Sequence, residues 1–386
     1  MKKLLKIIVF IVGFVLAAVL LLHLLGYDYL LRGIQVTYLQ GHKTAYIDDY
    51  PEFENRKIAA SNEPQSWPEH KNYNKVEATE KLEELNEELG TAAFLIIKND
   101  SIWFEKYYQD YGPSSKTNSF SMAKSIVSAL LGKAIMEGYI KSLSQPVADF
   151  FPQFDSSLKV GDLASMASGL NWKEDYYNPF GMTARTYFDD NIRELILNLK
   201  VVEKPGEEFK YLSGNIELLG MVIEKATGMS LSEYLSQSYW KTLGMKDDAL
   251  WQLDSRKSGM EKAYCCIASN ARDFARFGKL YKNYGKWNGK QVLDSAFVSK
   301  SIHPRFADSP QYGYGFWLSD YRDKEIFYMR GIRGQYVIVI PEDDLIIVRL
   351  GQDLIRKEEG AIHSPDFFMY IDETYKMLKS AGKNQS

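Results

Sequence analysis

The chain begins with an apolar stretch long enough to cross a membrane. Lys2, Lys3 and Lys6 come first, residues 7–22 are apolar, and His23 interrupts the stretch before two more leucines end it. At a rise of 1.5 Å per residue, about 20 apolar residues span a hydrocarbon core of roughly 30 Å. The lysines are expected to stay in the cytoplasm, which leaves the rest of the chain on the extracytoplasmic side.

A cleaved signal peptide has the same basic and apolar regions but ends in a small-x-small cleavage site. No convincing site of this kind follows Leu22. Residues 1–26 are therefore predicted to form an uncleaved, single-pass transmembrane anchor. A cleaved signal segment is the alternative, and the chain is exported in either case.

Periodic patterns further along the chain predict where its folded part begins. Residues 27–73 show no clear period and are interpreted as a partly ordered, membrane-proximal spacer. Apolar positions then recur every three or four residues across residues 74–89, and Gly90 follows, which predicts an amphipathic helix with a C-cap. The β-rich runs 91–98 and 102–108 are joined by a short Asn-Asp-Ser segment, which indicates a hairpin.

The middle of the chain is mostly helical, and strands return near its end. A strongly helical stretch covers residues 121–137, and further helical segments follow as far as residue 284. A closing helix is expected at residues 366–379. The late β-rich runs lie at residues 314–319, 326–331, 335–340 and 345–350. Strands at both ends indicate an α+β fold, with one antiparallel sheet flanked by helices and a mostly helical subdomain inserted, over residues 74–382.

The composition narrows the chemistry available to the chain. A formal net charge of −3 gives no electrostatic case for nucleic acid as a partner. The five histidines lack metal-ligand spacing, so neither a metal nor a cofactor is expected, and the chemistry must come from side chains. Cys265 and Cys266 are adjacent, and because neighbouring cysteines rarely bridge each other, they are expected to remain unbridged.

A serine three residues before a lysine on a helix can form a nucleophile with a basic group beside it. This spacing occurs four times, starting at Ser121, Ser156, Ser238 and Ser380. Only Ser121 opens a helix that would be buried nearly all round, and desolvation there favours the neutral, basic form of Lys124. The alternative is an N-cap serine with a lysine that extends to solvent.

Two later segments carry further candidate groups. Tyr211 and Ser213 follow a Pro-Gly turn, and a tyrosine at the start of a helix can pass a proton between a serine hydroxyl and a leaving group. As one of 26 tyrosines, Tyr211 could equally be a packing residue. Gly331 interrupts a β-rich run before Ile332, where a closely approaching backbone can aim an N–H at an oxyanion. A simple bulge between strands is the alternative.

The order of these segments resembles the plan of the β-lactamase and penicillin-binding-protein superfamily: Ser-x-x-Lys early, Tyr-x-Ser or Tyr-x-Asn midway, and a strand with glycine late. The resemblance covers about residues 90–350. Residues 163–170 and 243–245 are similar to its class C and esterase-like branch. Residues 271–278 and 331–335 are most similar to aminohexanoate-oligomer hydrolases. No GxSxG elbow is present, which disfavours an α/β-hydrolase fold.

The resemblance implies acyl transfer without a cofactor. Ser121 would attack a carbonyl while Lys124 and Tyr211 together take its proton. The backbone N–H groups of Ser121 and Ile332 would hold the oxyanion. Ser213 would orient Lys124 or the substrate, which would be a small ester or amide.

Two departures from the family pattern bear on the substrate. Ser213 stands where many relatives carry asparagine, and Met329-Arg330-Gly331 replaces the strand motif Lys-Thr-Gly. The missing lysine meets the substrate carboxylate in relatives that process β-lactams, so short esters or linear amides are expected to be preferred. Strand alternation would turn Arg330 away from the Met329 face, whereas Arg333 could bind an anionic substrate end or pair with a surface carboxylate.

Two classes of function therefore remain. The favoured one is an exported serine hydrolase, and the alternative is an envelope binding or sensor protein that keeps the fold without turnover. The presence of Ser121, Lys124 and Tyr211 favours the hydrolase, because a decayed site usually loses one of its groups. These patterns alone do not distinguish esters, linear amides and β-lactams.

Overall fold

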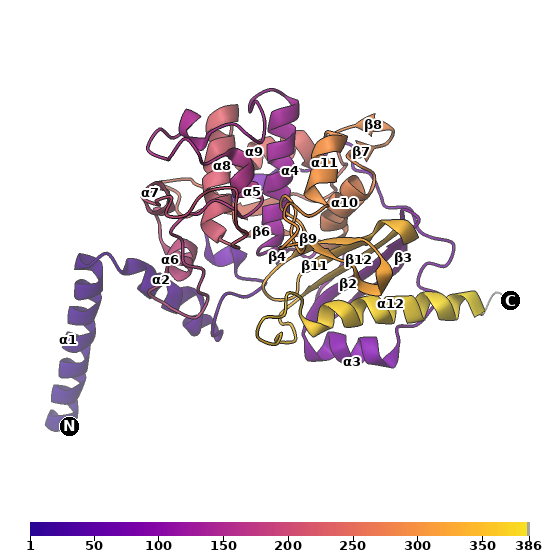
Figure 1. Ribbon diagram of the computed structural model, residues 1–386. Helices are drawn as coiled ribbons and strands as arrows, with labels where there is room; N and C mark the ends of the chain where they lie inside the picture. Colours follow the sequence, from indigo (N-terminus) through magenta and orange to yellow (C-terminus); the bar gives the residue numbers. More distant parts are fainter. Residues whose placement is uncertain (384–386) are drawn as a thin grey trace.

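A six-stranded antiparallel sheet forms the centre of the molecule in the computed structural model, which describes residues 1–383 (Figure 1). Its strands lie in the order β3-β2-β12-β11-β10-β9. Their bounds are β2 (Thr91–Lys98), β3 (Ser101–Tyr107), β9 (Trp317–Ser319), β10 (Ile326–Arg330), β11 (Tyr336–Ile340) and β12 (Leu345–Gly351). Because β2 pairs with β12, strands from distant parts of the chain complete one sheet, and the predicted α+β architecture is confirmed.

The β2–β3 hairpin forms at the predicted residues. Asn99 and Asp100 have φ angles of 50° and 57°. This left-handed backbone is the one that a tight two-residue hairpin turn requires, and Asn and Asp tolerate it better than most residues. The hairpin therefore follows directly from the local sequence.

Helices cover both faces of the main sheet (Figure 1). The helices α3 (Glu80–Glu88) and α12 (Pro365–Lys383) pack together below it, and α10 (Ala271–Lys282) packs on β2, β11 and β12 from the other side. With both faces covered, β2 is buried along almost its whole length, which explains its continuous apolar sequence.

The mostly helical subdomain is inserted between β3 and β9, as predicted. Its central pair is α4 and α8, which pack against each other, and α5 packs on α8. The helices of this part are α4 (Met122–Met136), α5 (Val160–Ala164), α6 (Met182–Phe188), α7 (Ile192–Leu197), α8 (Ser213–Thr227), α9 (Leu231–Leu235) and α11 (Ser295–Ser301).

A second, four-stranded antiparallel sheet lies beside this subdomain in the order β1-β5-β6-β4. Its strands are β1 (Asn55–Ile58), β4 (Thr117–Asn118), β5 (Ala249–Gln252) and β6 (Ile267–Ser269), and a separate small hairpin joins β7 (Lys286–Trp287) to β8 (Lys290–Gln291). The sequence analysis expected one sheet. Strands of two to four residues are too short for an alternating pattern to reveal them.

Residues 27–73 pack against the folded body and do not form the expected partly ordered spacer. Within this segment α2 (Asp28–Val36) contacts α6, and β1 pairs with β5. Asp49 is fully buried and accepts hydrogen bonds from Asn118 Nδ2 at 2.9 Å and Gln252 Nε2 at 3.1 Å. Burial raises the pKa of Asp49 to about 6. The hydrogen bonds partly offset this effect, because they favour the charged form of the carboxyl group.

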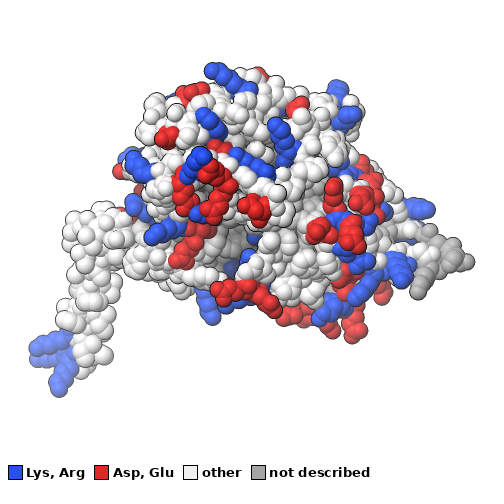
Figure 2. Space-filling view, viewed as in Figure 1, with Lys and Arg blue, Asp and Glu red and all other residues white. Residues whose placement is uncertain are grey.

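The N-terminal helix α1 (Lys2–Leu24) extends away from the rest of the molecule (Figure 1). None of its residues is buried, and Figure 2 shows basic side chains gathered at its free end, at the foot of an otherwise uncharged helix. The helix is long and apolar enough to cross a membrane, and a signal sequence would pass the same test.

Candidate active site

Ser121 lies at the point where the chain enters α4. The preceding residue, Phe120, has a φ of 44°, a strained left-handed conformation for a residue with a large side chain. Ser121 occupies the N-cap position, but its hydroxyl makes no capping hydrogen bond to the helix. Its Oγ instead accepts a hydrogen bond from Lys124 Nζ at 2.9 Å. The alternative of a simple N-cap serine is therefore wrong.

Lys124 is held inside the protein beside Ser121. Its side chain is only 1% exposed, because α4 is buried on nearly all sides by the sheet and by α8. Besides Ser121 Oγ, its amine donates to the backbone carbonyl of Tyr264 at 2.8 Å. The lysine does not extend to solvent, and these two acceptors aim its amine at the serine.

The other Ser-x-x-Lys pairs lack this arrangement. Lys159 donates to the backbone carbonyl of the exposed Ser156, and Lys241, the partner of Ser238, points to the surface. Ser380 donates to the carbonyl of Met377 within α12. Burial of the lysine separates the Ser121 pair from the pairs at Ser156 and Ser238, as the sequence predicted.

Tyr211 lies beside the same lysine. Lys124 Nζ is 5.2 Å from the centre of the Tyr211 ring, a separation typical of a cation–π contact. Trp317 and Tyr312 pack against that ring at centroid distances of 5.2 Å and 6.0 Å. The structure thus gathers Ser121, Lys124 and Tyr211 at one place, with the tyrosine ring held by aromatic neighbours.

Ser213 is directed elsewhere. Its hydroxyl donates to Glu174 Oε1 at 2.7 Å, and its backbone N–H donates to Glu174 Oε2 at 2.6 Å. Trp172 Nε1 also donates to Oε2, at 2.7 Å. Ser213 therefore does not orient Lys124, as had been expected. It instead holds the loop around Glu174 against the start of α8. Glu174 lies in an irregular loop, where no sequence pattern marks it.

The turn between β10 and β11 brings backbone groups close to the serine. A Cβ atom added to Gly331 would lie 2.8 Å from the carbonyl oxygen of Ser119, so only glycine fits there. Gly331 N donates to Gln335 O at 2.8 Å, which closes the turn and rules out a simple bulge. Within residues 1–383, neither the N–H of Ile332 nor that of Ser121 has a hydrogen-bond acceptor. Both N–H groups are therefore available to a ligand.

Comparison with known proteins gives the family. The Beta-lactamase family model matches residues 78–363, well over half of the sequence. The chain belongs to the beta-lactamase family. The superfamily resemblance inferred from the order of motifs is thereby confirmed.

Relatives with hydrolase names are similar over most of their length. A 6-aminohexanoate-dimer hydrolase from Paenarthrobacter ureafaciens is 26% identical over 295 residues, which cover 70% of this chain and 74% of that relative. A provisionally named 6-aminohexanoate-dimer hydrolase from Bacillus anthracis has the same fold, with a TM-score of 0.73 at 20% identity over 93% of this chain and 95% of that one. A penicillin-binding protein from Bacillus halodurans gives a TM-score of 0.59 at 14% identity over 70% and 95% of the two chains.

The basic residues near the late strand require a correction. Met329, which stands in place of the family's strand lysine, is fully buried in the core. Arg330 lies 3.7 Å above the centre of the Trp317 ring, the same ring that packs on Tyr211. Met329 and Arg330 lie on opposite faces of β10, as strand alternation predicts. Arg330, however, lies on the face toward Trp317 and Tyr211, whereas the sequence analysis expected it to point away from the site. Arg333 donates through Nε to the carbonyl of Gln352, so its guanidinium is engaged with the main chain.

The backbone of Tyr264 is a part of the site that the sequence analysis missed. Its carbonyl holds Lys124, and its N–H donates to Glu217 Oε2 at 3.2 Å. Glu217 comes from α8 and is fully buried, and this burial raises the pKa of its carboxyl group to about 8. A backbone contact carries no signature in side-chain identity, so the sequence could not reveal it.

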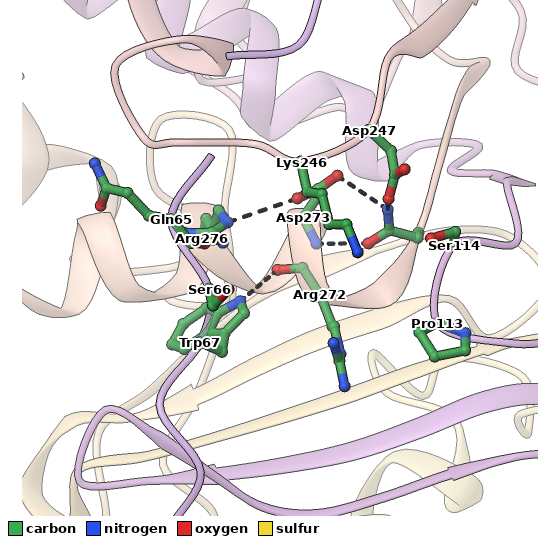
Figure 3. A pocket seen from close by; sticks show the side chains of 11 residues that line it. Gln65, Ser66, Trp67, Pro113, Ser114, Lys246, Asp247, Arg272, Asp273 and Arg276 are labelled. Carbon is green, nitrogen blue, oxygen red and sulfur yellow. Dashed lines mark hydrogen bonds and ion pairs between the residues drawn. The ribbon is translucent and has the colours of Figure 1, made fainter. Parts of the chain in front are cut away.

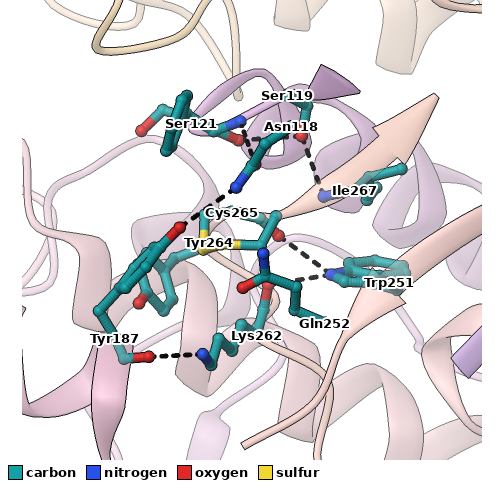
Figure 4. Close-up of a disulfide and its surroundings, with 12 residues drawn as sticks. Asn118, Ser119, Ser121, Tyr187, Trp251, Gln252, Lys262, Tyr264, Cys265 and Ile267 are labelled. Atoms are coloured by element: carbon teal, nitrogen blue, oxygen red, sulfur yellow. Dashed lines mark hydrogen bonds between the residues drawn. A yellow bond between two sulfur atoms is a disulfide. The ribbon is translucent and has the colours of Figure 1, made fainter. Parts of the chain in front are cut away.

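Cys265 and Cys266, which directly follow Tyr264, form a disulfide (Figure 4). The expectation that these adjacent cysteines remain unbridged is therefore wrong. Both are buried, and the turn that contains them brings the two sulfur atoms together. Within residues 1–383 no group of His, Cys, Asp or Glu side chains is arranged for a metal ion.

A small cavity lies away from these groups, between α10 and the segment around Trp67 (Figure 3). Part of its polar lining is already paired: Trp67 Nε1 donates to Arg272 O at 2.9 Å, and Asn270 Nδ2 donates to Asp247 at 3.1 Å. None of the catalytic candidates lines it. Residues 271–278, which are similar in sequence to the oligomer hydrolases, form most of α10, and several of them line this cavity.

Proposed function

We propose that this protein is an exported serine hydrolase that cleaves an ester or a linear amide through an acyl-enzyme on Ser121. One observation carries the proposal: the buried amine of Lys124 donates to a serine hydroxyl that has no capping role in its helix. A buried amine that directly contacts a hydroxyl is the arrangement by which a weak nucleophile is activated.

In the proposed mechanism, Ser121 Oγ attacks the substrate carbonyl carbon, and its proton passes to the Lys124 and Tyr211 pair. The tetrahedral oxyanion is held by the N–H groups of Ser121 and Ile332, each worth about 3 kcal/mol to the transition state. Tyr211 then protonates the leaving group. Water releases the acyl group by the reverse route, with no cofactor.

A second candidate is an envelope binding or sensor protein that binds similar molecules without turnover. The two unpaired N–H groups and the Lys124–Ser121 hydrogen bond favour the hydrolase, because a binding protein has no need of an activated serine. The two candidates differ in a measurable way, since only a hydrolase releases product repeatedly.

We expect short esters to be hydrolysed with a higher kcat/KM than penicillins. Met329 provides no charge in place of the family's strand lysine, and Arg330 is partly engaged with Trp317 and with the carbonyl of Ile362, to which it donates at 2.8 Å. Losing one charge-assisted contact to a substrate carboxylate costs on the order of 1.5–3 kcal/mol, or roughly ten- to a hundred-fold in affinity. The measurement compares p-nitrophenyl butyrate with nitrocefin and benzylpenicillin.

Higher kcat/KM values for the two β-lactams would contradict this preference. That outcome would mean that Arg330 takes over the role of the missing lysine. An absence of turnover with every ester, amide and β-lactam tried would instead favour the sensor.

We further propose that α1 is retained as a single-pass anchor with the catalytic body on the extracytoplasmic side. Three lysines precede its apolar stretch, and no small-x-small site follows it. N-terminal sequencing of the protein from the membrane fraction is expected to start at or near Met1. A mature chain that begins after Gly26 would identify residues 1–26 as a cleaved signal segment.

A further inference from the structure

The turn that contains the disulfide lies between two contacts that shape the active site (Figure 4). On one side, Tyr264 O accepts the hydrogen bond from Lys124 Nζ. On the other, Ile267 at the start of β6 is bonded twice to Ser119: Ile267 N donates to Ser119 Oγ at 3.1 Å, and Ser119 N donates to Ile267 O at 2.8 Å. Ser119 lies two residues before the candidate nucleophile. The turn at 265–266 thus lies between the contact that holds the lysine amine and the contact that holds the segment leading into Ser121.

The backbone of this turn is one that a residue with a side chain rarely adopts. Cys266 has a φ of 76°, in the left-handed region where Cβ crowds the following carbonyl. A glycine would adopt it freely, but the chain has a cysteine here. A covalent bridge between neighbouring residues closes a small ring that includes their peptide bond, and such a ring limits the conformations open to that backbone.

Hydrogen bonds also hold this turn, including one from Cys265 N to Lys262 O at 3.1 Å, and the bridge adds a covalent constraint to them. Trp251 Nε1 donates to the carbonyls of Lys262 at 2.9 Å and Cys265 at 3.0 Å. Gln252 N donates to Cys266 O at 3.1 Å, and Glu217 receives the N–H of Tyr264. The Tyr264 carbonyl has only the lysine as its partner within residues 1–383.

We propose that the Cys265–Cys266 disulfide is a positioning element of the active site. By holding Cys266 in its left-handed conformation, it points the Tyr264 carbonyl at Lys124, and the lysine amine is thereby aimed at Ser121. The kinetic test of this inference rests on the proposed function. Formation of the bridge removes two protons and two electrons from the two thiols and passes the electrons to a thiol–disulfide oxidoreductase. Such oxidants act on the extracytoplasmic side, where the catalytic body is proposed to lie.

The first test asks whether the bridge exists in the purified full-length chain. The chain has only two cysteines, so a thiol titration under denaturing conditions reads this pair alone. We expect no titratable thiol before reduction and two after it. Two thiols in the untreated protein, kept under air from cell lysis onward, would overturn the inference.

The second test measures what the bridge does. A water-soluble phosphine reduces the disulfide to two thiols and is itself oxidised to the phosphine oxide, with the oxygen taken from water. We expect kcat for p-nitrophenyl butyrate to fall about tenfold, the effect of losing one well-aimed hydrogen bond, while KM stays unchanged. Reoxidation should restore kcat. The matched control, C265A/C266A, should have the low kcat and no response to the phosphine.

A third comparison separates positioning from general support of the fold. In C265A/C266G the bridge is absent, but glycine adopts the left-handed conformation without strain. We expect its kcat to exceed that of C265A/C266A at equal KM and at a temperature where both are fully folded. Equal kcat values in these two variants would overturn the positioning role.

The outcomes keep the two proposals apart. A chain that hydrolyses the ester at the same rate in its oxidised and reduced forms overturns the role of the disulfide and leaves the proposed function intact. A chain that hydrolyses no ester or amide in either form overturns the proposed function itself.

Discussion

Replacing Ser121 with alanine should abolish covalent labelling by a fluorophosphonate probe and reduce kcat on the order of 10⁴-fold or more, as deletion of the nucleophile does in other serine hydrolases. The physical reason is that Lys124 would keep its position but have no hydroxyl to activate. Mass spectrometry of the labelled wild-type protein should locate the adduct on the peptide that contains Ser121. Steady-state kinetics on a p-nitrophenyl ester would measure the loss.

Ser156→Ala is the matched control, because Ser156 also stands three residues before a lysine but is exposed. This variant should keep full labelling and full activity. An adduct on Ser156 or Ser238, or a Ser121→Ala variant that still turns over, would contradict the assignment of the nucleophile. Stoichiometric labelling of Ser121 without ester turnover would favour the sensor.

Lys124→Ala and Tyr211→Phe should each remove most of the turnover, by roughly 10²- to 10⁴-fold, the range for loss of a positioned acid–base group. The double variant should be little worse than either single one, because groups that act as one proton-transfer unit are strongly non-additive. The Lys124 amine lies 5.2 Å from the Tyr211 ring and 2.9 Å from Ser121 Oγ, so the three groups are close enough to couple. The measurement is kcat/KM for all four proteins.

Tyr312→Phe serves as the control for this series. Tyr312 packs against Tyr211 in the same aromatic group, so the variant removes a neighbouring hydroxyl and leaves both rings in place. It should keep its activity within a few-fold, while Tyr211→Phe does not. Independent, additive losses for Lys124 and Tyr211 would indicate that Tyr211 only supports the packing around Trp317.

Local patterns were sufficient for much of the architecture. The hairpin follows from Asn99 and Asp100, two residues that tolerate a left-handed backbone between apolar runs. The helix after Ser121 follows from an apolar composition that is buried on nearly all sides. The order of Ser121, Tyr211 and Gly331 along the chain predicted a family that the comparison confirms over residues 78–363. Each of these conclusions rests on local residue patterns and on the order of short motifs along the chain.

Short strands and their partners depended on the tertiary structure. The strand β1 has only four residues and no pattern of its own, and it exists because its backbone groups pair with β5. Asp49 is buried in the same region, where Asn118, Gln252 and Tyr187, all distant in sequence, donate hydrogen bonds to it. The local sequence of residues 27–73 therefore could not show that this segment packs into the folded body of the protein.

The candidate nucleophile, its lysine, the tyrosine and the class of fold could all be predicted from the sequence, because they follow from helix period, apolar composition and motif order. The orientation of side chains that have several available partners became clear only from the three-dimensional packing. In the folded protein Ser213 donates to Glu174, Arg330 stacks on the Trp317 ring beside Tyr211, and Cys265 is bonded to Cys266. These contacts depend on how helices, strands and loops are oriented relative to one another. That orientation is set by packing between parts of the chain that are distant in sequence.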